Sequence, residues 1–129
     1  MAQGDYTHPS YLTRQILMFT ATAGANGTSD IKALPWDIDV HQLSSVVVTA
    51  GTTAGATVFL LAGTATVANS TITNGTSTAG VTGTTGDLAT KITAGTLISI
   101  KNGTDATGVA RVAMEYNINP TTGTWLGVE

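Results

Sequence analysis

The chain has 129 residues, enough for one two-layer domain and too few for two independent cores. Only 10% of the residues are charged, the net charge is −3 and 26 residues are threonine, so we expect a neutral surface rich in hydroxyl groups. The five Lys and Arg residues cannot neutralise the roughly 6 to 10 phosphates that a duplex-binding protein contacts, which excludes nucleic acid as an expected partner.

The first fifteen residues, MAQGDYTHPSYLTRQ, form a predicted N-terminal arm. Two of the three tyrosines and a proline occur here, before any strand pattern begins, and rigid amphipathic residues are favoured where a surface is buried against a partner. A purely flexible terminus is usually richer in Ser, Glu or Lys. We interpret residues 1–15 as a docking arm with the contact residues Tyr6, Pro9, Tyr11 and Arg14. The alternative is an arm folded back onto its own domain.

Strand signals fill most of the remaining chain, and no apolar stripe of helical period persists. The segment TRQILMFTA predicts the first strand. In PWDIDVH, apolar and polar residues alternate from Trp36 to His41, which indicates a strand or an extended connection. The segments LSSVVVTAG and ATVFLLAG predict two buried strands joined by a short glycine-containing turn.

The second half of the chain continues this pattern after a weaker segment. Residues 63–86 contain little apolar material and an Asn-Gly pair, so we expect a flexible Gly/Thr-rich loop or an edge hairpin there. DLATKITAG fits a short helical turn and an extended segment equally well. TLISIKNG predicts another strand. The clearest strand is GVARVAMEYNINP, where period-2 alternation from Arg111 to Ile118 is typical of a half-buried strand and Pro120 ends it.

Together these segments predict an all-β domain. About seven or eight short strands, separated by Gly and Asn turns at roughly ten-residue spacing, are typical of an antiparallel β-sandwich or jelly roll. We therefore predict a single β-sandwich domain over residues 16–129, preceded by the extended N-terminal arm.

Polar residues in PWDIDVH raise the question of a metal site. Asp37, Asp39 and His41 carry groups that bind divalent ions, but the alternation requires polar residues on an outer face in any case, so we favour a solvated face. Ser44 and Ser45 follow closely, yet the chain has no nucleophile-elbow motif. We expect no catalytic residues, no bound metal, no cofactor and no enzyme activity.

The two tryptophans permit a different function. Exposed aromatic rings can form a carbohydrate-binding platform, which would make the protein a carbohydrate-binding β-sandwich module. However, Trp36 alternates in phase with Ile38 and Val40, and Trp125 follows in a tail, so core or interface packing is favoured. Carbohydrate binding stays the alternative to a structural role.

Cysteine content and hydropathy indicate which bonds the chain can form and where in the cell it is made. The absence of cysteine excludes disulfides and Cys-based zinc sites. The first thirty residues lack a basic region followed by an apolar run, and no stretch approaches the roughly 18 to 20 apolar residues of a membrane span. We expect a soluble protein made in the cytoplasm, with no membrane partner. The low charge also favours association with protein partners.

Four segments carry a resemblance to a known family: the arm GDYTHPSYLTRQ, then LPWDIDVHQLSSVVVTAGTTAGATVFLLAG, then ITAGTLISIKNG and the last strand GVARVAMEYNI. Their order resembles the small Gly/Thr-rich decoration, or cement, proteins of tailed-bacteriophage capsids. The resemblance implies a β-sandwich or jelly-roll homo-oligomer, with a trimer favoured, on the outer capsid surface of the virion. It further implies that the protein is made in the host cytoplasm, bridges neighbouring major capsid subunits and stabilises the shell. The alternative is a phage tail or fibre-type carbohydrate-binding β-sandwich module.

Overall fold

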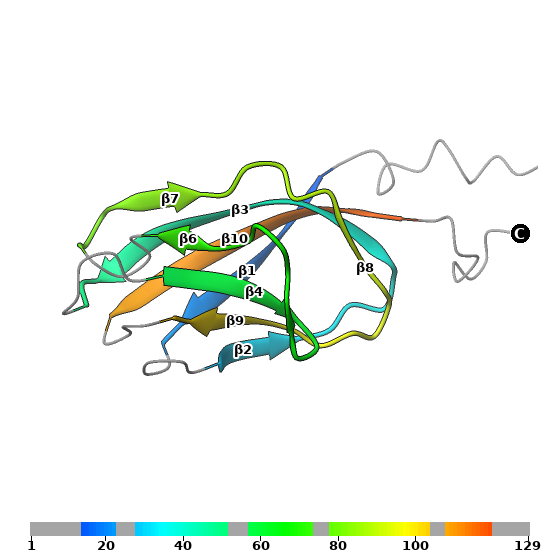
Figure 1. Cartoon of the computed structure of the whole chain (residues 1–129), viewed down its shortest axis with the longest axis horizontal. Coiled ribbons are helices and arrows are strands. Elements are labelled where there is room, and N and C mark those ends of the chain that lie inside the picture. The colour runs from blue at the N-terminus through cyan, green and yellow to red at the C-terminus, as the bar shows by residue number, and fades with distance from the viewer. Residues whose placement is uncertain (1–13, 23–27, 52–56, 74–77, 104–107, 120–129) are drawn as a thin grey trace, which may run out of the picture.

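The computed structural model describes residues 14–22, 28–51, 57–73, 78–103 and 108–119. Within these ranges the chain forms ten strands and no helix, which confirms the all-β prediction (Figure 1). In the same ranges there is accordingly no helix that could span a membrane. The strands are β1 (Gln15–Ala21), β2 (Thr28–Lys32), β3 (Ile38–Thr49), β4 (Thr57–Ala62), β5 (Ala65–Thr66), β6 (Ile72–Thr73), β7 (Thr82–Thr84), β8 (Thr90–Ile92), β9 (Ile98–Asn102) and β10 (Val109–Ile118).

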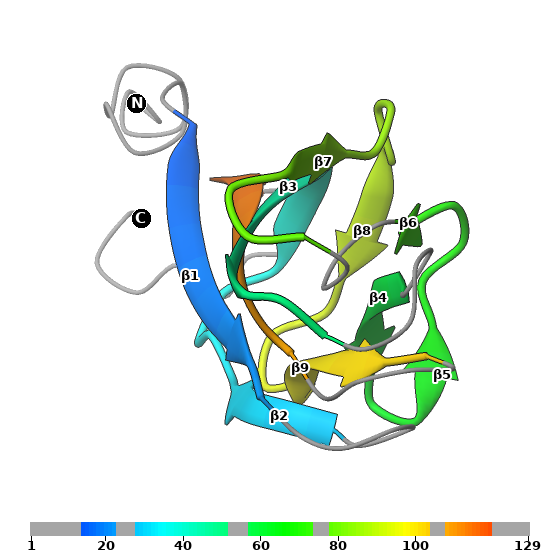
Figure 2. The ribbon, with the colours of Figure 1, turned by 90° about the vertical axis from the view of Figure 1, so that its left-hand side faces the viewer.

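The strands form two antiparallel sheets packed face to face (Figures 1 and 2). Sheet A has the order β1-β10-β3-β7, with β8 also paired to β3. Sheet B has the order β2-β9-β4-β5, with β6 also paired to β4. Strands from the two ends of the chain therefore pair with each other, and each following pair lies inside the previous one in sequence: β1–β10, β2–β9, β3–β7/β8 and β4–β5/β6. This nested pairing across two sheets is a jelly roll, which confirms the predicted fold class.

The core lies between the two sheets and follows from period-2 alternation. In β10, the side chains that the alternation predicted to share one face are all buried, and Arg111 on the opposite face is exposed. Each fully buried Val, Leu or Ile contributes about 1.5–3 kcal/mol to stability. The fully buried aliphatic residues of the two sheets include Ile38, Val40, Leu43, Val112 and Met114 from sheet A, and Val58, Leu60, Ile72, Ile98 and Ile100 from sheet B.

Strand β3 is one continuous strand formed by two segments that were predicted separately, PWDIDVH and LSSVVVTAG. Val40 lies opposite Tyr116 of β10. Gln42 lies opposite the preceding β10 residue, Glu115, so His41 is the extra residue of a β-bulge. Because an inserted residue reverses which side chains point inward, even-numbered residues are buried before the bulge and odd-numbered residues after it.

Residues 63–86 contain three short strands. β5 and β6 pair with β4 in sheet B, whereas β7 pairs with β3, so the chain crosses between the sheets after β6. The following DLATKITAG segment takes the extended alternative. The Leu88 N–H donates to the carbonyl of His41 at 2.8 Å, and β8 continues the pairing with β3. β7 and β8 together therefore extend sheet A beyond β3.

Candidate functional site

Four large apolar side chains are exposed on sheet A, where a soluble domain usually places polar groups. They are Ile16 and Met18 on β1, which are 61% and 49% exposed, and Val46 and Val48 on β3, which are 38% and 49% exposed. We call these four residues the apolar face of sheet A. Exposed apolar residues grouped on one face commonly mark an interaction surface.

Strand register shows how this face is composed. Met18 lies opposite Ala113 of β10, and Ala113 lies opposite Ser44 of β3. In the neighbouring row, Arg111 of β10 lies between Thr20 and Val46. On this side of sheet A the apolar side chains are therefore mixed with hydroxyl side chains, and charged residues lie on β10, at Arg111 and Glu115, and at the Asp39–Lys91 pairing of β3 and β8.

Arg14 is the one predicted contact residue that the structure describes, because Tyr6, Pro9 and Tyr11 lie outside the described residues. Its Nη1 atom lies 3.2 Å from Oε1 of Glu115 on β10, and the Arg14 side chain is 55% exposed. An exposed ion pair of this kind contributes about 0–1 kcal/mol. The pair places Arg14 beside β10, at the point where residues 1–13 precede sheet A.

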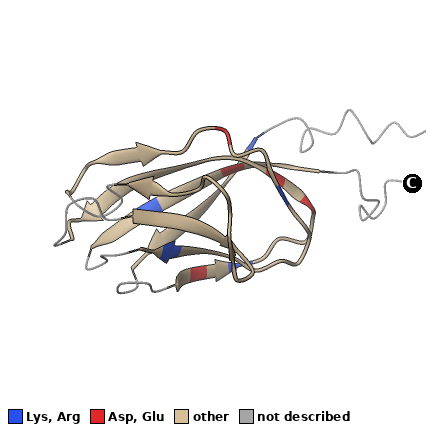
Figure 3. Cartoon of the chain, viewed as in Figure 1, with Lys and Arg blue, Asp and Glu red and all other residues tan. Residues whose placement is uncertain are grey.

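Charged residues of the described strands are scattered and mixed in sign, as Figure 3 shows. Asp30 of β2 illustrates their local role, since its Oδ2 accepts a hydrogen bond from the Thr20 N–H at 2.7 Å and its Oδ1 lies 3.1 Å from Lys32 Nζ. Desolvation raises the pKa of Asp30, but the Thr20 N–H and the Lys32 ammonium outweigh this and hold it below its ordinary value. These charges stabilise the corner between β1 and β2.

Asp37 does not lie on a solvated face, so the prediction was wrong for this residue. It is only 6% exposed, and its Oδ1 accepts a hydrogen bond from the Ala94 N–H at 2.7 Å. Its carbonyl accepts a second bond, from the Asn119 N–H at 2.7 Å. A carboxylate can be buried here because it satisfies a backbone donor of the segment that connects β8 to β9.

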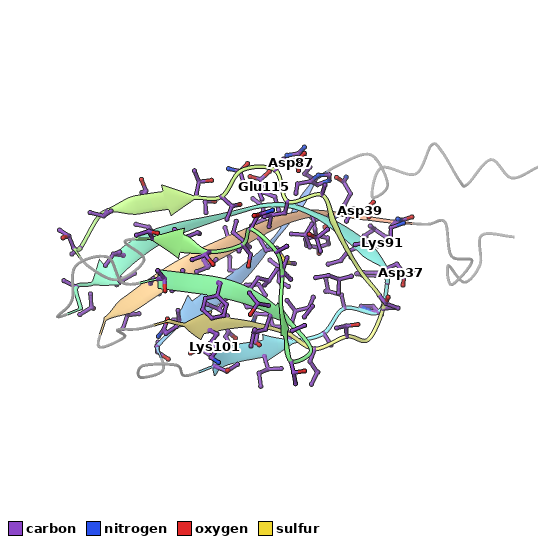
Figure 4. All side chains as sticks on the ribbon, viewed as in Figure 1. Asp37, Asp39, Asp87, Lys91, Lys101 and Glu115 are labelled. Carbon is purple, nitrogen blue, oxygen red and sulfur yellow. The ribbon has the colours of Figure 1, made fainter. Side chains whose placement is uncertain are left out.

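Asp39 and His41 are half-buried and bind asparagine side chains of the β10 segment. Both oxygens of Asp39 lie 3.3 Å from Nδ2 of Asn119, and Nε2 of His41 is hydrogen-bonded to Oδ1 of Asn117. Figure 4 shows Asp37 and Asp39 at the same end of the sandwich as Lys91. Within the described ranges, no group of three or more His, Cys, Asp or Glu side chains could hold a metal ion.

The residues considered for nucleophilic catalysis and for carbohydrate binding do not come together in one site either. Ser45 points into the sandwich and is 5% exposed, whereas the imidazole of His41 is engaged with Asn117, so the structure does not bring them together as a nucleophile and base. Trp36 is partly buried and packs against the core, as its phase predicted, and Trp125 lies outside the described residues.

The apolar face of sheet A was missed by the sequence analysis. The signal was present in QILMFTA, where four consecutive apolar residues replace the alternation expected of a strand with one wet face. Because side chains alternate between the two faces of a strand, only two of the four can point toward the interior. In β1 these are Leu17 and Phe19, and Ile16 and Met18 face outward. Which pair faces outward depends on the register with β10.

No protein-family model matches the chain, and no curated protein matches it. Among solved structures, one similar chain comes from the structure of infectious bursal disease virus Gx strain, with a TM-score of 0.28 and 12% sequence identity. The match covers 85% of this chain and 33% of that one, so this chain spans about a third of the matched chain's length. The fold assignment rests on the strand order given above and not on this match.

Proposed function

We propose that this protein is a structural virion protein that decorates and stabilises the capsid of a tailed bacteriophage. In this role it binds on the outer shell and bridges neighbouring major capsid subunits. The observation that carries the proposal is the apolar face of sheet A, half of which lies on β1, the strand that directly follows the predicted docking arm.

The fold is compatible with this role and does not by itself establish it. Jelly rolls build viral capsid proteins, lectins and cupins, so the architecture admits several functions. The lectin-type alternative needs exposed aromatic side chains; of the two tryptophans, Trp36 packs against the core and Trp125 lies outside the described residues. A metal-dependent cupin-type site needs clustered ligands, and the described residues contain no such cluster.

The composition of the face indicates how a capsid would be held. Covering a side chain such as Ile16 or Met18 removes apolar surface from water and favours binding by about 25 cal/mol per Å². Arg14, which is more than half exposed beside this face, can add a polar contact at its rim. A contact dominated by apolar burial should depend only weakly on salt concentration.

The arm supplies the second attachment of the bridge. Two linked contacts bind more tightly than either alone when the linker lets both engage. Because β1 begins at Gln15, removal of residues 1–13 leaves Arg14 and the strand intact. We expect this truncated protein to remain folded and to be released from the shell.

The test uses expanded capsid shells of a tailed phage whose genome encodes the chain, mixed with purified protein and sedimented. Val46→Lys and Val48→Lys each place a charge on the apolar face without altering β1. We expect each variant to weaken shell binding at least about tenfold, because a lysine would be buried against the capsid.

Ile31→Lys and Leu97→Lys are matched controls. Ile31 is 61% exposed and belongs to β2 of sheet B. Leu97 is 56% exposed and directly precedes β9 of the same sheet. We expect both controls to sediment with the shells like the unmodified protein. Failure of the unmodified protein to bind shells, or equal loss in the control variants, would contradict the proposal.

A further inference from the structure

In the part of the chain that the structure describes, strand β1 forms an edge of sheet A whose first half lacks the usual protection. Native edge strands avoid pairing with other chains by means of prolines, lysines, bulges or a covering segment. The β1 sequence QILMFTA contains no proline or lysine, and its register with β10 shows no bulge. Among the described strands, β10 is its sole partner in the sheet.

The second half of the same edge is protected by side chains from β2. The N–H of Thr20 donates to Asp30 at 2.7 Å, and the N–H of Thr22 donates to the Ser29 hydroxyl at 3.2 Å. Because backbone groups of alternate residues point to the same side of a strand, the N–H groups of Ile16 and Met18 also point away from β10. Considering the described residues alone, the open part of the edge is therefore the stretch around Ile16 and Met18.

This stretch is complementary to itself. An antiparallel pairing about a two-fold axis at Leu17 places Ile16 opposite Met18 of a second copy, and Met18 opposite Ile16 of that copy. Opposed residues whose groups point to the shared edge exchange both backbone hydrogen bonds. Their side chains also lie on the same face, so each pairing joins two apolar side chains, a favourable cross-strand combination.

Charge complementarity supports the same register. With the axis at Leu17, Arg14 lies opposite Thr20 of the second copy, and Asp30 sits beside Thr20 because it accepts that residue's N–H. Arg14 and Asp30 flank opposite ends of β1 and pair within one chain with Glu115 and Lys32 respectively. At each end of the contact, the two-fold pairing therefore sets the Arg14–Glu115 ion pair of one copy near the Asp30–Lys32 ion pair of the other. Asp30 keeps the Thr20 N–H, so the exchanged backbone hydrogen bonds are those of Ile16 and Met18.

We infer that two copies of this chain associate through their β1 edges, forming one continuous antiparallel sheet across a two-fold axis. This contact is isologous, so it closes after two copies and gives a dimer. It differs from the trimer that the family resemblance implies. It also does not rest on the proposed capsid function, because it requires no other protein.

The test is the solution mass of the full chain without capsid, measured by light scattering and sedimentation velocity across micromolar concentrations. We expect about twice the chain mass of 13.1 kDa. The key variant is Met18→Pro, which removes an N–H that points away from β10 and so leaves the β1–β10 bonds intact. We expect it to weaken dimerisation at least about tenfold while circular dichroism stays unchanged.

Leu97→Lys is the matched control, because Leu97 is an exposed apolar residue that precedes β9 of sheet B, away from the β1 edge, and its replacement should leave the dimer intact. If Met18→Pro fails to fold, Arg14→Glu provides a second probe. This variant places a glutamate carboxylate near the Asp30 carboxylate of the second copy, and the repulsion between them should also weaken the dimer. A monomer at every concentration, a trimer, or a dimer unaffected by both β1 variants would overturn the inference.

Discussion

Two buried serines show how differently the same side chain can be accommodated in this sandwich. The Ser70 hydroxyl accepts a hydrogen bond from the Leu60 N–H at 3.1 Å and donates to the Val67 carbonyl at 2.7 Å. The Ser45 hydroxyl is also buried, but it has no hydrogen-bond partner among the residues that the structure describes. A buried polar group without a partner costs about 1–3 kcal/mol.

We therefore expect Ser45→Ala to raise the free energy of unfolding by about 1 kcal/mol, because it removes an unsatisfied hydroxyl group. Ser70→Ala should lower the free energy of unfolding by about 1–3 kcal/mol, because it leaves the Leu60 N–H without its acceptor. Urea denaturation of both variants measures the two changes. Equal destabilisation by both substitutions would show that the Ser45 hydroxyl is in fact hydrogen-bonded.

At the scale of elements, the start of β10 depends on a close approach of two backbone segments. A Cβ atom added to Gly108 would lie 2.5 Å from the carbonyl oxygen of Thr49 and 2.6 Å from the nitrogen of Gly51. Both contacts are with backbone atoms, which cannot rotate away as a side chain can. Glycine at this position lets the end of β3 pack against the start of β10.

Gly108→Ala should therefore lower the free energy of unfolding by about 1–3 kcal/mol, as overpacking of a filled site typically does. Gly86→Ala is the matched control, because an added Cβ at Gly86 meets nothing within 4 Å. We expect that control to be neutral or to stabilise by less than about 1 kcal/mol. Thermal unfolding of the two variants makes the comparison. A Gly108→Ala protein as stable as the unmodified one would indicate that the two segments can separate without cost.

At the scale of the whole molecule, stability should fall at both extremes of pH. Burial raises the pKa of Tyr116 above its ordinary value of 10.0, so the folded state retains the proton more strongly than the unfolded state does. This contribution is fully present below pH 10 and is lost as the pH rises through the folded-state pKa. Asp30 has the opposite sign: its lowered pKa stabilises the fold above its ordinary value of 3.8, and this contribution is lost as the pH falls.

The measurement is the midpoint of urea unfolding as a function of pH for the unmodified protein, Tyr116→Phe and Asp30→Asn. We expect Tyr116→Phe to lose less stability than the unmodified protein above pH 10, and Asp30→Asn to lose less below pH 3.8. Identical pH profiles for all three proteins would exclude both residues as the groups responsible.

Dimerisation through β1 and binding to the capsid are also connected at the scale of the whole molecule. Pairing through β1 would set two copies of sheet A side by side, so that one dimer presents the apolar face twice. Such an arrangement suits a protein that bridges two capsid subunits, because each half of the dimer can bind one of them. Dimerisation and shell binding are nevertheless measured separately, with β1 variants for the first and Val46 or Val48 variants for the second.

The sequence by itself determined the fold class and much of the core, because period-2 alternation within a strand such as β10 is a local property of consecutive residues. It also predicted correctly that Trp36 packs inward. The burial of Asp37, the bulge at His41 and the outward position of Ile16 and Met18 could not be predicted in the same way. Each of these depends on which distant strand lies alongside and in which register, and that pairing is decided only when the two sheets form around a shared core.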